Sequence, residues 1–311
     1  MALFSHGKIV TVLQYFTDKV EDYWHILYPL VPKKERDNDR YLYFYDISKK
    51  ATLYKGKFNE DGLYLFLGYD GEYHLHALEL AQYSLACWLA WRKSGEELWK
   101  RRALLHCDWL VSNQNKDGSW SIIHKNPSYK DLPSPWSSAL AQGFAISSLL
   151  RAYYNTGNDD YLLCAKRALL PLEMSVDSKG LKREFTKEEV RGFIYEEYPR
   201  KDLSGVLNGY ISVILAIYEL SKVDKEYRLL FKKNIENLKH ILPLYECGYW
   251  SYYSLDGVIS SGFYHRLVVR QLAVLSEFDE FFHVYFNKWM RYQENKFFAW
   301  KAFLVKIKAK L

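Results

Sequence analysis

Cysteines are few in this sequence, and they follow no pattern. Cys87, Cys107, Cys164 and Cys247 are the four cysteines of a 311-residue chain, and no two of them form a C-x-x-C pair. This spacing does not match a zinc-binding pattern or a disulfide framework. Reduced, buried thiols are therefore expected, and the cytoplasm is the expected compartment.

Long apolar and long basic runs are also missing. No apolar stretch reaches the ~18 residues of a transmembrane helix, so no membrane span is expected. The beginning of the sequence lacks the clean apolar run and cleavage site of a secretory signal. The net charge of +6 is spread along the chain, which favours an anionic partner but does not indicate nucleic acid. The exception is the basic tail 301–311, expected to be the solvated end of an amphipathic helix.

Two kinds of cofactor signal are absent as well. The sequence has no glycine-rich nucleotide-binding loop, and no His, Asp and Glu set with the spacing of metal ligands. Neither a cofactor nor a metal is therefore expected.

Hydrophobic and aromatic residues, in contrast, are abundant. Hydrophobic residues make up 49% of the chain, enough for a sizeable core, and 27 residues are tyrosines. Tyrosine has an apolar body and a polar tip, which suits clefts and sugar-facing surfaces as well as cores. No linker or low-complexity tract interrupts the chain, so one domain over 1–311 is predicted, with an N-terminal elaboration over 1–73 and a helical region over 74–311.

The N-terminal elaboration is predicted to be a helix followed by a small β meander. Apolar residues at helical spacing favour one amphipathic helix over 8–29, before a charged loop over 31–40. Three short runs rich in Tyr, Phe and Leu follow and predict strands over 41–46, 52–58 and 63–70.

From residue 74 onward the pattern predicts four antiparallel helical hairpins. Each pair is joined by a short turn with acidic residues near the start of the second helix, as in SGEE, TGNDD, VDKE and FDE. Stacked hairpins form a solenoid or a toroid, and the predicted fold is a mainly α, incomplete α/α toroid. The longer connections over 117–136, 178–201 and 246–263 are expected to meet at one end and form a cleft.

The first notable motif is NQNKDGSW (113–120), in which Gln114, Gly118 and Trp120 have the Q-x-x-x-G-x-W spacing found in the turns of terpene cyclase toroids. A cyclase also needs an acidic initiator such as D-x-D-D. Asp159 and Asp160 are instead placed to cap a helix. The interpretation is a structural turn in which Trp120 packs beneath the next hairpin.

The second motif, IYEEYPRKD (194–202), has the residues for proton transfer. Glu197 and Tyr198 are candidates for a general acid and base, because burial tunes a carboxyl upward and cations lower the pKa of a phenol. Tyr253 and Tyr264, in SYYSLDG and GFYHRL, are placed to flank the same cleft. By composition alone a charged loop and packing tyrosines explain these residues equally well.

Several of these segments together resemble the C-terminal catalytic domain of the D-glucuronyl C5-epimerases. The resemblance runs in order from about residue 76 and rests on PWSSALAQGFAISSLLRAYY, EEYP, SGVLNGY, LPLYECG and the Tyr-His pair of GFYHR. It implies an α/α toroid that turns glucuronate into iduronate within heparosan and heparan sulfate precursors. It also implies that Glu197, Tyr198, Tyr253 and Tyr264 handle the C5 proton.

The resemblance further implies substrate-binding residues. Trp136, Gln142 and Asn208 match positions along the cleft wall. The sequence departs from the family after Tyr253, where an Arg is usual and SLDG is found, and upstream of AQY, where Tyr73, His74 or His76 stand in. These departures concern the polymer more than the chemistry.

Epimerisation adds negative charge to an already anionic uronate, so cations are expected near its carboxylate. The candidates by sequence position are Arg151, Arg191, Arg200, Lys201, Arg266 and Arg270. The predicted partner is an anionic uronate polysaccharide, and a homodimer is allowed. Two alternatives stay open: a polysaccharide lyase or uronyl hydrolase on a similar toroid, and a non-catalytic glycan-binding module.

Overall fold

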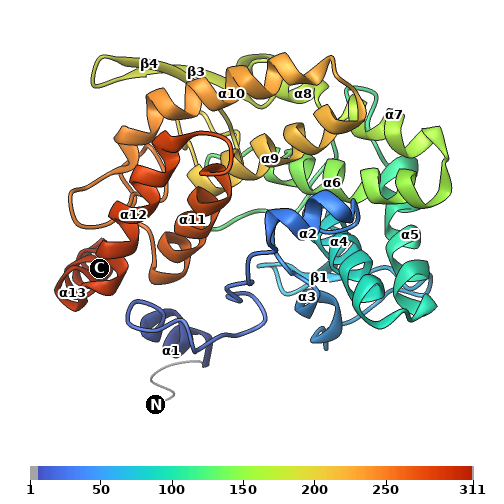
Figure 1. The fold of residues 1–311 in the computed structure, drawn as a ribbon, viewed down its shortest axis with the longest axis horizontal. Coiled ribbons are helices and arrows are strands. Elements are labelled where there is room, and N and C mark those ends of the chain that lie inside the picture. The colour runs from blue at the N-terminus through green and yellow to red at the C-terminus, as the bar shows by residue number, and fades with distance from the viewer. Residues whose placement is uncertain (1–5, 310–311) are drawn as a thin grey trace.

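A computed structural model of the chain describes residues 6–309, and their structure is mainly helical (Figure 1). Four antiparallel hairpins form most of the molecule, as the sequence predicts. They are α4 (Ala77–Ser94) with α5 (Glu97–Ser112), α6 (Ala139–Thr156) with α7 (Asp159–Arg167), α9 (Leu207–Val223) with α10 (Tyr227–Ile241), and α11 (Gly262–Leu275) with α12 (Glu280–Glu294).

The hairpin turns follow from local capping. α4 and α6 each end at a glycine with a positive φ, Gly95 (74°) and Gly157 (70°), a conformation that costs glycine little. Asn158 and Asp279 then cap α7 and α12, because each side chain accepts a hydrogen bond from a backbone N–H of the first turn.

The first helix of each hairpin lies inside and the second lies outside. α4, α6, α9 and α11 pack against one another in that order. α6 and α9 approach closely at Gly143 of α6, where a Cβ atom would lie 3.3 Å from the backbone of Ser212 and Val213 in α9. Larger residues at this position would push the two inner helices apart.

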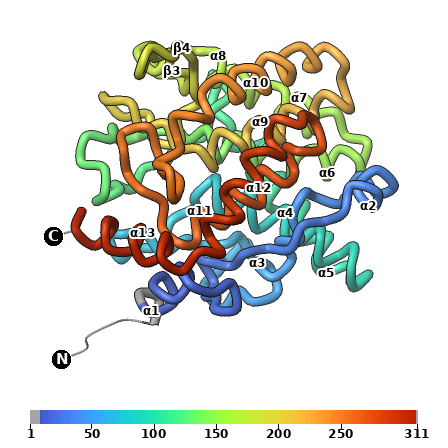
Figure 2. The backbone as a smooth tube through the Cα atoms, turned by 60° about the vertical axis from the view of Figure 1, so that its left-hand side comes forward, coloured from blue at the N-terminus to red at the C-terminus, as the bar shows by residue number. Residues whose placement is uncertain are grey.

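The N-terminal segment contacts both ends of this row of helices (Figure 2). α3 (Lys49–Thr52) packs on α4, while α1 (His6–Leu13) packs on α11. Arg36, in α2 (Lys33–Asn38), forms an ion pair with Glu277 at 2.5 Å. The largest hydrophobic cluster accordingly contains buried residues from this segment and from all four hairpins.

Within this segment the structure corrects three sequence predictions. The helix expected over 8–29 ends at Leu13, because Gln14 Nε2 donates to the carbonyls of Val20 and His25 and folds the chain back. The loop expected over 31–40 contains the helix α2. The expected meander is reduced to isolated bridges and the two-residue strands β1 (Phe66–Leu67) and β2 (Tyr73–His74). Its aromatic residues stack in the core instead, as Tyr54 does on Tyr64.

The connection between α7 and α9 contains a hairpin that the sequence did not reveal. β3 (Lys182–Lys187) pairs with β4 (Val190–Tyr195) in antiparallel register, Lys182 opposite Tyr195. The short elements α8 (Leu170–Glu173) and η1 (Val176–Ser178) precede it. β4 leads directly into the EEYP motif, so this hairpin positions the motif.

Two further elements remain: η2 (Leu242–Tyr245), which directly follows α10, and α13 (Lys296–Lys308), which follows α12. α13 confirms a helix in the basic tail up to residue 308. Residues 310 and 311 of that tail lie outside the described residues. No helix within residues 6–309 has the length and apolarity needed to cross a bilayer, and all four cysteines are free thiols, three of them buried.

NQNKDGSW forms a structural turn, as interpreted from the sequence. Gly118 has a φ of 85°, and a Cβ atom there would lie 2.0 Å from the Arg167 carbonyl at the end of α7. Gln114 Nε2 donates to the carbonyls of Gly118 and Cys164. Trp120 is 1% exposed, and its Nε1 donates to the Leu110 carbonyl. The motif therefore joins the first two hairpins.

Candidate active site

A cleft of about 560 Å³ lies where the N-terminal segment meets the starts of α4, α9 and α11. One wall comes from the N-terminal segment and includes Lys50, Tyr69 and His76. The other comes from the helical region and includes Glu197, Tyr198 and residues at the start of α11. Residues far apart in the sequence therefore face one space.

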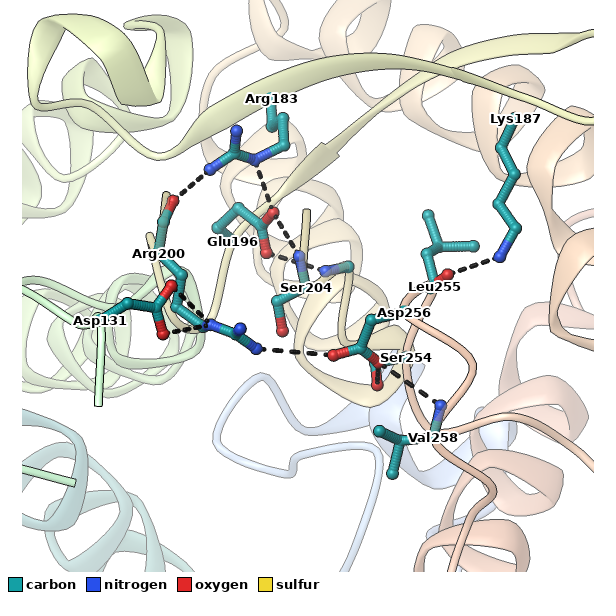
Figure 3. A network of polar contacts seen from close by, with 11 residues as sticks. Asp131, Arg183, Lys187, Glu196, Arg200, Ser204, Ser254, Leu255, Asp256 and Val258 are labelled. Atoms are coloured by element: carbon teal, nitrogen blue, oxygen red, sulfur yellow. Dashed lines mark hydrogen bonds and ion pairs between the residues drawn. The ribbon is translucent and has the colours of Figure 1, made fainter. Parts of the chain in front are cut away.

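The EEYP motif is fixed in place by its first glutamate (Figure 3). Glu196 is fully buried, and its carboxylate accepts hydrogen bonds from Arg183 Nε at 2.9 Å and from the backbone N–H groups of Ser204 and Gly205 at 3.1 and 2.9 Å. Its backbone carbonyl accepts from Ala139 N at the start of α6. Side chains alternate along an extended chain, so Glu197 is directed to the cleft.

Glu197 is a buried carboxyl without full hydrogen bonding. Its side chain lines the cleft, is only 5% exposed, and its Oε2 has no hydrogen-bond partner among residues 6–309. It lies against the first turn of α9, where a Cβ atom on Gly209 would be 2.8 Å from Oε2. Burial raises the pKa of Glu197 to about 7, while its interaction with Tyr198 opposes the rise. Both protonation states are therefore populated near neutral pH.

Three tyrosines surround this carboxyl. The rings of Tyr253 and Tyr264 lie 4.7 Å apart, on the loop after η2 and in the first turn of α11. Burial raises the pKa of Tyr198, Tyr253 and Tyr264, and the charge of Glu197 is the next largest cause for each. The structure thus brings the four predicted residues together, and it keeps the phenols protonated at neutral pH.

This result corrects one expectation about the tyrosines. The sequence predicts cations near the site, with Arg200, Lys201 and Arg266 among the candidates, and nearby cations would lower the pKa of a phenol. Arg266 instead donates to the Gln14 carbonyl, and Lys201 is exposed. The tyrosines are therefore suited to donate protons, and Glu197 is suited to accept one.

An aromatic stack supports Tyr198 from behind. Its ring lies 4.4 Å from Tyr129 and 5.6 Å from Trp136, and the Arg200 guanidinium lies 5.0 Å from the Tyr129 ring. Arg200 also pairs with Asp131 at 2.9 Å and with Asp256 at 3.5 Å (Figure 3). Asp256, the aspartate of SLDG, is thus paired with a guanidinium from the EEYP loop.

The stack continues along the cleft through imidazole rings. The His124 ring lies 6.2 Å from Trp136 and 4.9 Å from His76, which lies 5.2 Å from Phe66. Burial lowers the pKa of His124, and it lowers that of His76 to about 3, so both rings are neutral at neutral pH. The wall is therefore a largely uncharged aromatic surface, which suits the face of a sugar ring.

Among the described residues, Lys50 and Arg270 are the cations that line the cleft, and Arg270 was a predicted candidate. Arg270 donates to the Tyr28 carbonyl and lies 4.0 Å from Asp18. Lys50 pairs with Glu79 at 2.9 Å. Arg151 belongs to the core instead, where it is fully buried and pairs with Glu219 at 2.7 Å.

The remaining predicted binding residues divide into three groups. Trp136 and Asn208 line the cleft, and the buried Asn208 Oδ1 has no hydrogen-bond partner among the described residues. Gln142 does not line it, because its Nε2 donates to the carbonyls of Gly118 and Ala168 within the core. Tyr73 and His74 do not line it either: Tyr73 contacts Lys57, and His74 pairs with Asp70 at 2.8 Å.

Several cleft residues carried too little signal to be found from the sequence. Tyr129 and His124 lie in the 117–136 connection, which was expected to carry function but offered no motif at these positions. Lys50 and Tyr69 lie in the segment read as a meander. Over residues 6–309 no group of three His, Cys, Asp or Glu side chains is arranged to hold a metal ion.

Comparison with known sequences identifies the family. Residues 114–291 match the D-glucuronyl C5-epimerase C-terminus. The chain belongs to this family. It is 31% identical to the D-glucuronyl C5-epimerase of Caenorhabditis elegans over 215 residues, which are 61% of this chain and 34% of the worm protein.

Other relatives extend the comparison. An uncharacterized protein of Methanocaldococcus jannaschii is 27% identical over 208 residues, 62% of this chain and 67% of that protein. Among solved structures, a family 76 glycoside hydrolase from a bovine Bacteroides thetaiotaomicron strain has a TM-score of 0.47 at 14% identity, over 66% of this chain and 44% of the hydrolase.

The family match covers one wall of the cleft. Glu197, Tyr198, Tyr253 and Tyr264 lie inside residues 114–291 of this epimerase-family chain, whereas the N-terminal wall lies outside them. The chain spans about a third of the length of the worm relative. Residues 23–76 therefore supply a wall of the cleft that lies outside the family match, and they face the wall that lies inside it.

Proposed function

We propose that this chain epimerises D-glucuronate to L-iduronate residues at C5 within an anionic polysaccharide. The observation that carries the proposal is the buried carboxyl of Glu197, which has an unpartnered oxygen and three neutral tyrosines around it. Membership of the epimerase family supports the same chemistry. The worm relative is named for this reaction.

The reaction needs a base and an acid on opposite faces of one carbon. Ionised Glu197 takes the C5 proton, and the electron pair of the broken C–H bond is delocalised into the uronate carboxylate. Tyr253 or Tyr264 then donates its O–H proton to the other face of C5, which inverts the centre. Glu197 ends protonated and the tyrosine ends as a phenolate, and proton exchange with water restores both groups.

The rest of the cleft suits a sugar polymer. Trp136, His124 and His76 offer flat, neutral faces on which sugar rings stack. Asn208 Oδ1 is free to accept a hydrogen bond from a hydroxyl. Arg270 and Lys50 supply positive charge for uronate carboxylates, although Lys50 shares its charge with Glu79. This supports a uronate polymer as the substrate class.

The test is incubation with heparosan in heavy water, followed by NMR of the C5 position. Deuterium at C5 together with iduronate signals is the expected result. An unsaturated, ultraviolet-absorbing uronate would instead identify a lyase. Binding of heparosan and of other glucuronate polymers without any deuterium uptake would identify a glycan-binding module. Either of these results overturns the proposal.

A further inference from the structure

The helix α13 exposes four large apolar residues on one face. Phe297, Trp300, Leu304 and Ile307 are spaced three or four residues apart, so they lie on one face of the helix. They are 72%, 52%, 59% and 40% exposed, and together they are called the apolar stripe.

Another face attaches α13 to the body through two alanines and the partly buried Phe303. Ala299 and Ala302 are buried in a cluster with Tyr15 and Trp250. A surface helix normally buries its large apolar residues and exposes its polar ones. The face of α13 that carries the apolar stripe departs from this rule, because its four large apolar residues are exposed within the described chain.

Lysines flank the apolar stripe. Lys301 and Lys308 directly follow Trp300 and Ile307, so they lie along one edge, while Lys296 lies near the other edge. All three are exposed, and Lys301 lies over the Tyr249 ring at 3.9 Å. α13 contains no Asp or Glu to neutralise them.

The apolar surface continues onto α1. Ile9 and Leu13 of that helix are 46% and 39% exposed. The Phe16 ring, just beyond α1, lies 4.8 Å from Trp300. Figures 1 and 2 both show α1 beside α13 at one end of the molecule. The two helices thus combine exposed apolar residues with a row of positive charge.

We propose that α13, with α1 beside it, docks the protein onto an anionic membrane surface. The helix lies in the plane of the interface, with the apolar stripe among the upper acyl chains and the lysines at anionic head groups. An aromatic-rich apolar face bordered by lysines is the pattern of interfacial helices, and apolar insertion and charge attraction together give stable binding.

The lysines argue against a second copy of this chain as the occupant. A two-fold contact through the apolar stripe would bring the lysine edges of two α13 helices together. Like charges placed opposite each other weaken such a contact, and α13 offers no carboxylate for pairing. An anionic bilayer complements both the stripe and its edges.

Vesicle flotation of the full chain tests the proposal. Wild type should float with phosphatidylcholine vesicles that contain phosphatidylglycerol, and much less with phosphatidylcholine alone. Trp300→Ser with Leu304→Ser should abolish flotation. The double variant Lys296→Gln, Lys308→Gln should bind anionic vesicles with an affinity lower by about fivefold for each lysine removed.

Leu229→Ser is the matched control, because Leu229 is 76% exposed on α10, away from this surface, and it should float as wild type does. Circular dichroism of each variant checks that the helices remain folded. Failure of wild type to float with anionic vesicles overturns the proposal. So does concentration-dependent dimerisation in analytical ultracentrifugation that is lost in the Trp300→Ser, Leu304→Ser variant, since a second copy would then occupy the stripe.

Discussion

Two adjacent glutamates of the EEYP motif have very different hydrogen bonding on the two sides of the motif. Behind the motif, Glu196 accepts three hydrogen bonds, one of them from Arg183, within a network that reaches Arg200 and Asp131 (Figure 3). In front of it, Glu197 lines a cleft, and one of its oxygens is unpartnered. A carboxylate with several donors fixes the backbone, whereas a carboxyl with an open oxygen remains available for proton transfer.

This contrast predicts that the Glu197→Gln substitution stops the reaction. The amide keeps the shape of the side chain but cannot take the C5 proton, and loss of a general base costs about 10²–10⁴-fold in rate. C5 deuterium exchange and iduronate formation, both read by NMR, should fall together. Glu196→Gln is the comparison: it should lower stability while the rate per folded molecule stays near wild type. Equal rate losses in the two variants would refute the distinction.

The tyrosines Tyr253 and Tyr264, which lie near Glu197, are expected to have the next largest effect. Tyr253→Phe and Tyr264→Phe preserve packing and remove one O–H each, and the variant that loses the proton donor should epimerise about 10²–10³-fold more slowly. It should still exchange the C5 proton with solvent, because Glu197 can return a deuteron to the same face.

Tyr252→Phe is the matched control, since Tyr252 neighbours Tyr253 in sequence but interacts with Cys247 and Glu188, whereas Tyr253 interacts with Glu197. This variant should act as wild type does. Near wild-type epimerisation by both Tyr253→Phe and Tyr264→Phe would show that these tyrosines only pack.

The network behind the motif is expected to matter for folding rather than for chemistry. Arg183→Met removes the charged partner of the buried Glu196, which should lower the free energy of unfolding by about 2–4 kcal/mol in urea titrations. Arg191→Met, on the neighbouring strand, removes an exposed arginine and should change that free energy by less than about 0.5 kcal/mol. Similar stability in both variants would contradict the role assigned to the network.

A smaller effect should appear in the pH dependence of stability. The pKa of Glu197 is about 7 in the folded chain and 4.5 as its ordinary value, so the folded state binds this proton more tightly. The resulting stabilisation is complete below pH 4.5 and is lost as the pH rises through 7. Glu197→Gln should therefore be more stable than wild type by about 1–3 kcal/mol at pH 8, and equal to it near pH 4.5. Identical unfolding curves at pH 8 would mean that the carboxyl is not destabilised by burial.

Gly209→Ala should give the smallest change and separate fold from function. Alanine favours a helix by up to about 1 kcal/mol over glycine, so stability should hold or rise slightly. The added Cβ atom would lie 2.8 Å from Glu197 Oε2 and should move the carboxyl, which we expect to slow epimerisation by roughly tenfold. Thermal unfolding and NMR rates check both parts. An unchanged rate would show that the carboxyl position tolerates the shift.

The sequence by itself determined the features that depend on near neighbours. Helical periodicity and caps such as Asn158 and Asp279 act within a few residues, and the four hairpins were predicted from them. The motif around Glu197 and the tyrosines at 253 and 264 were likewise found from residue type and order. Even the structural turn at Gly118 was interpreted correctly, because glycine and tryptophan at that spacing have local meaning.

Only the tertiary structure decided the environment and the partners of each charged or aromatic side chain. Nothing in the sequence distinguishes Arg151, which pairs with Glu219 in the core, from Arg270, which lines the cleft. The aromatic runs of the N-terminal segment satisfy strand periodicity, yet they pack against α4 because burying their rings stabilises the chain more than a short sheet would. Burial and pairing depend on residues that are distant in sequence, so the pKa of Glu197 and the N-terminal wall of the cleft followed from the fold.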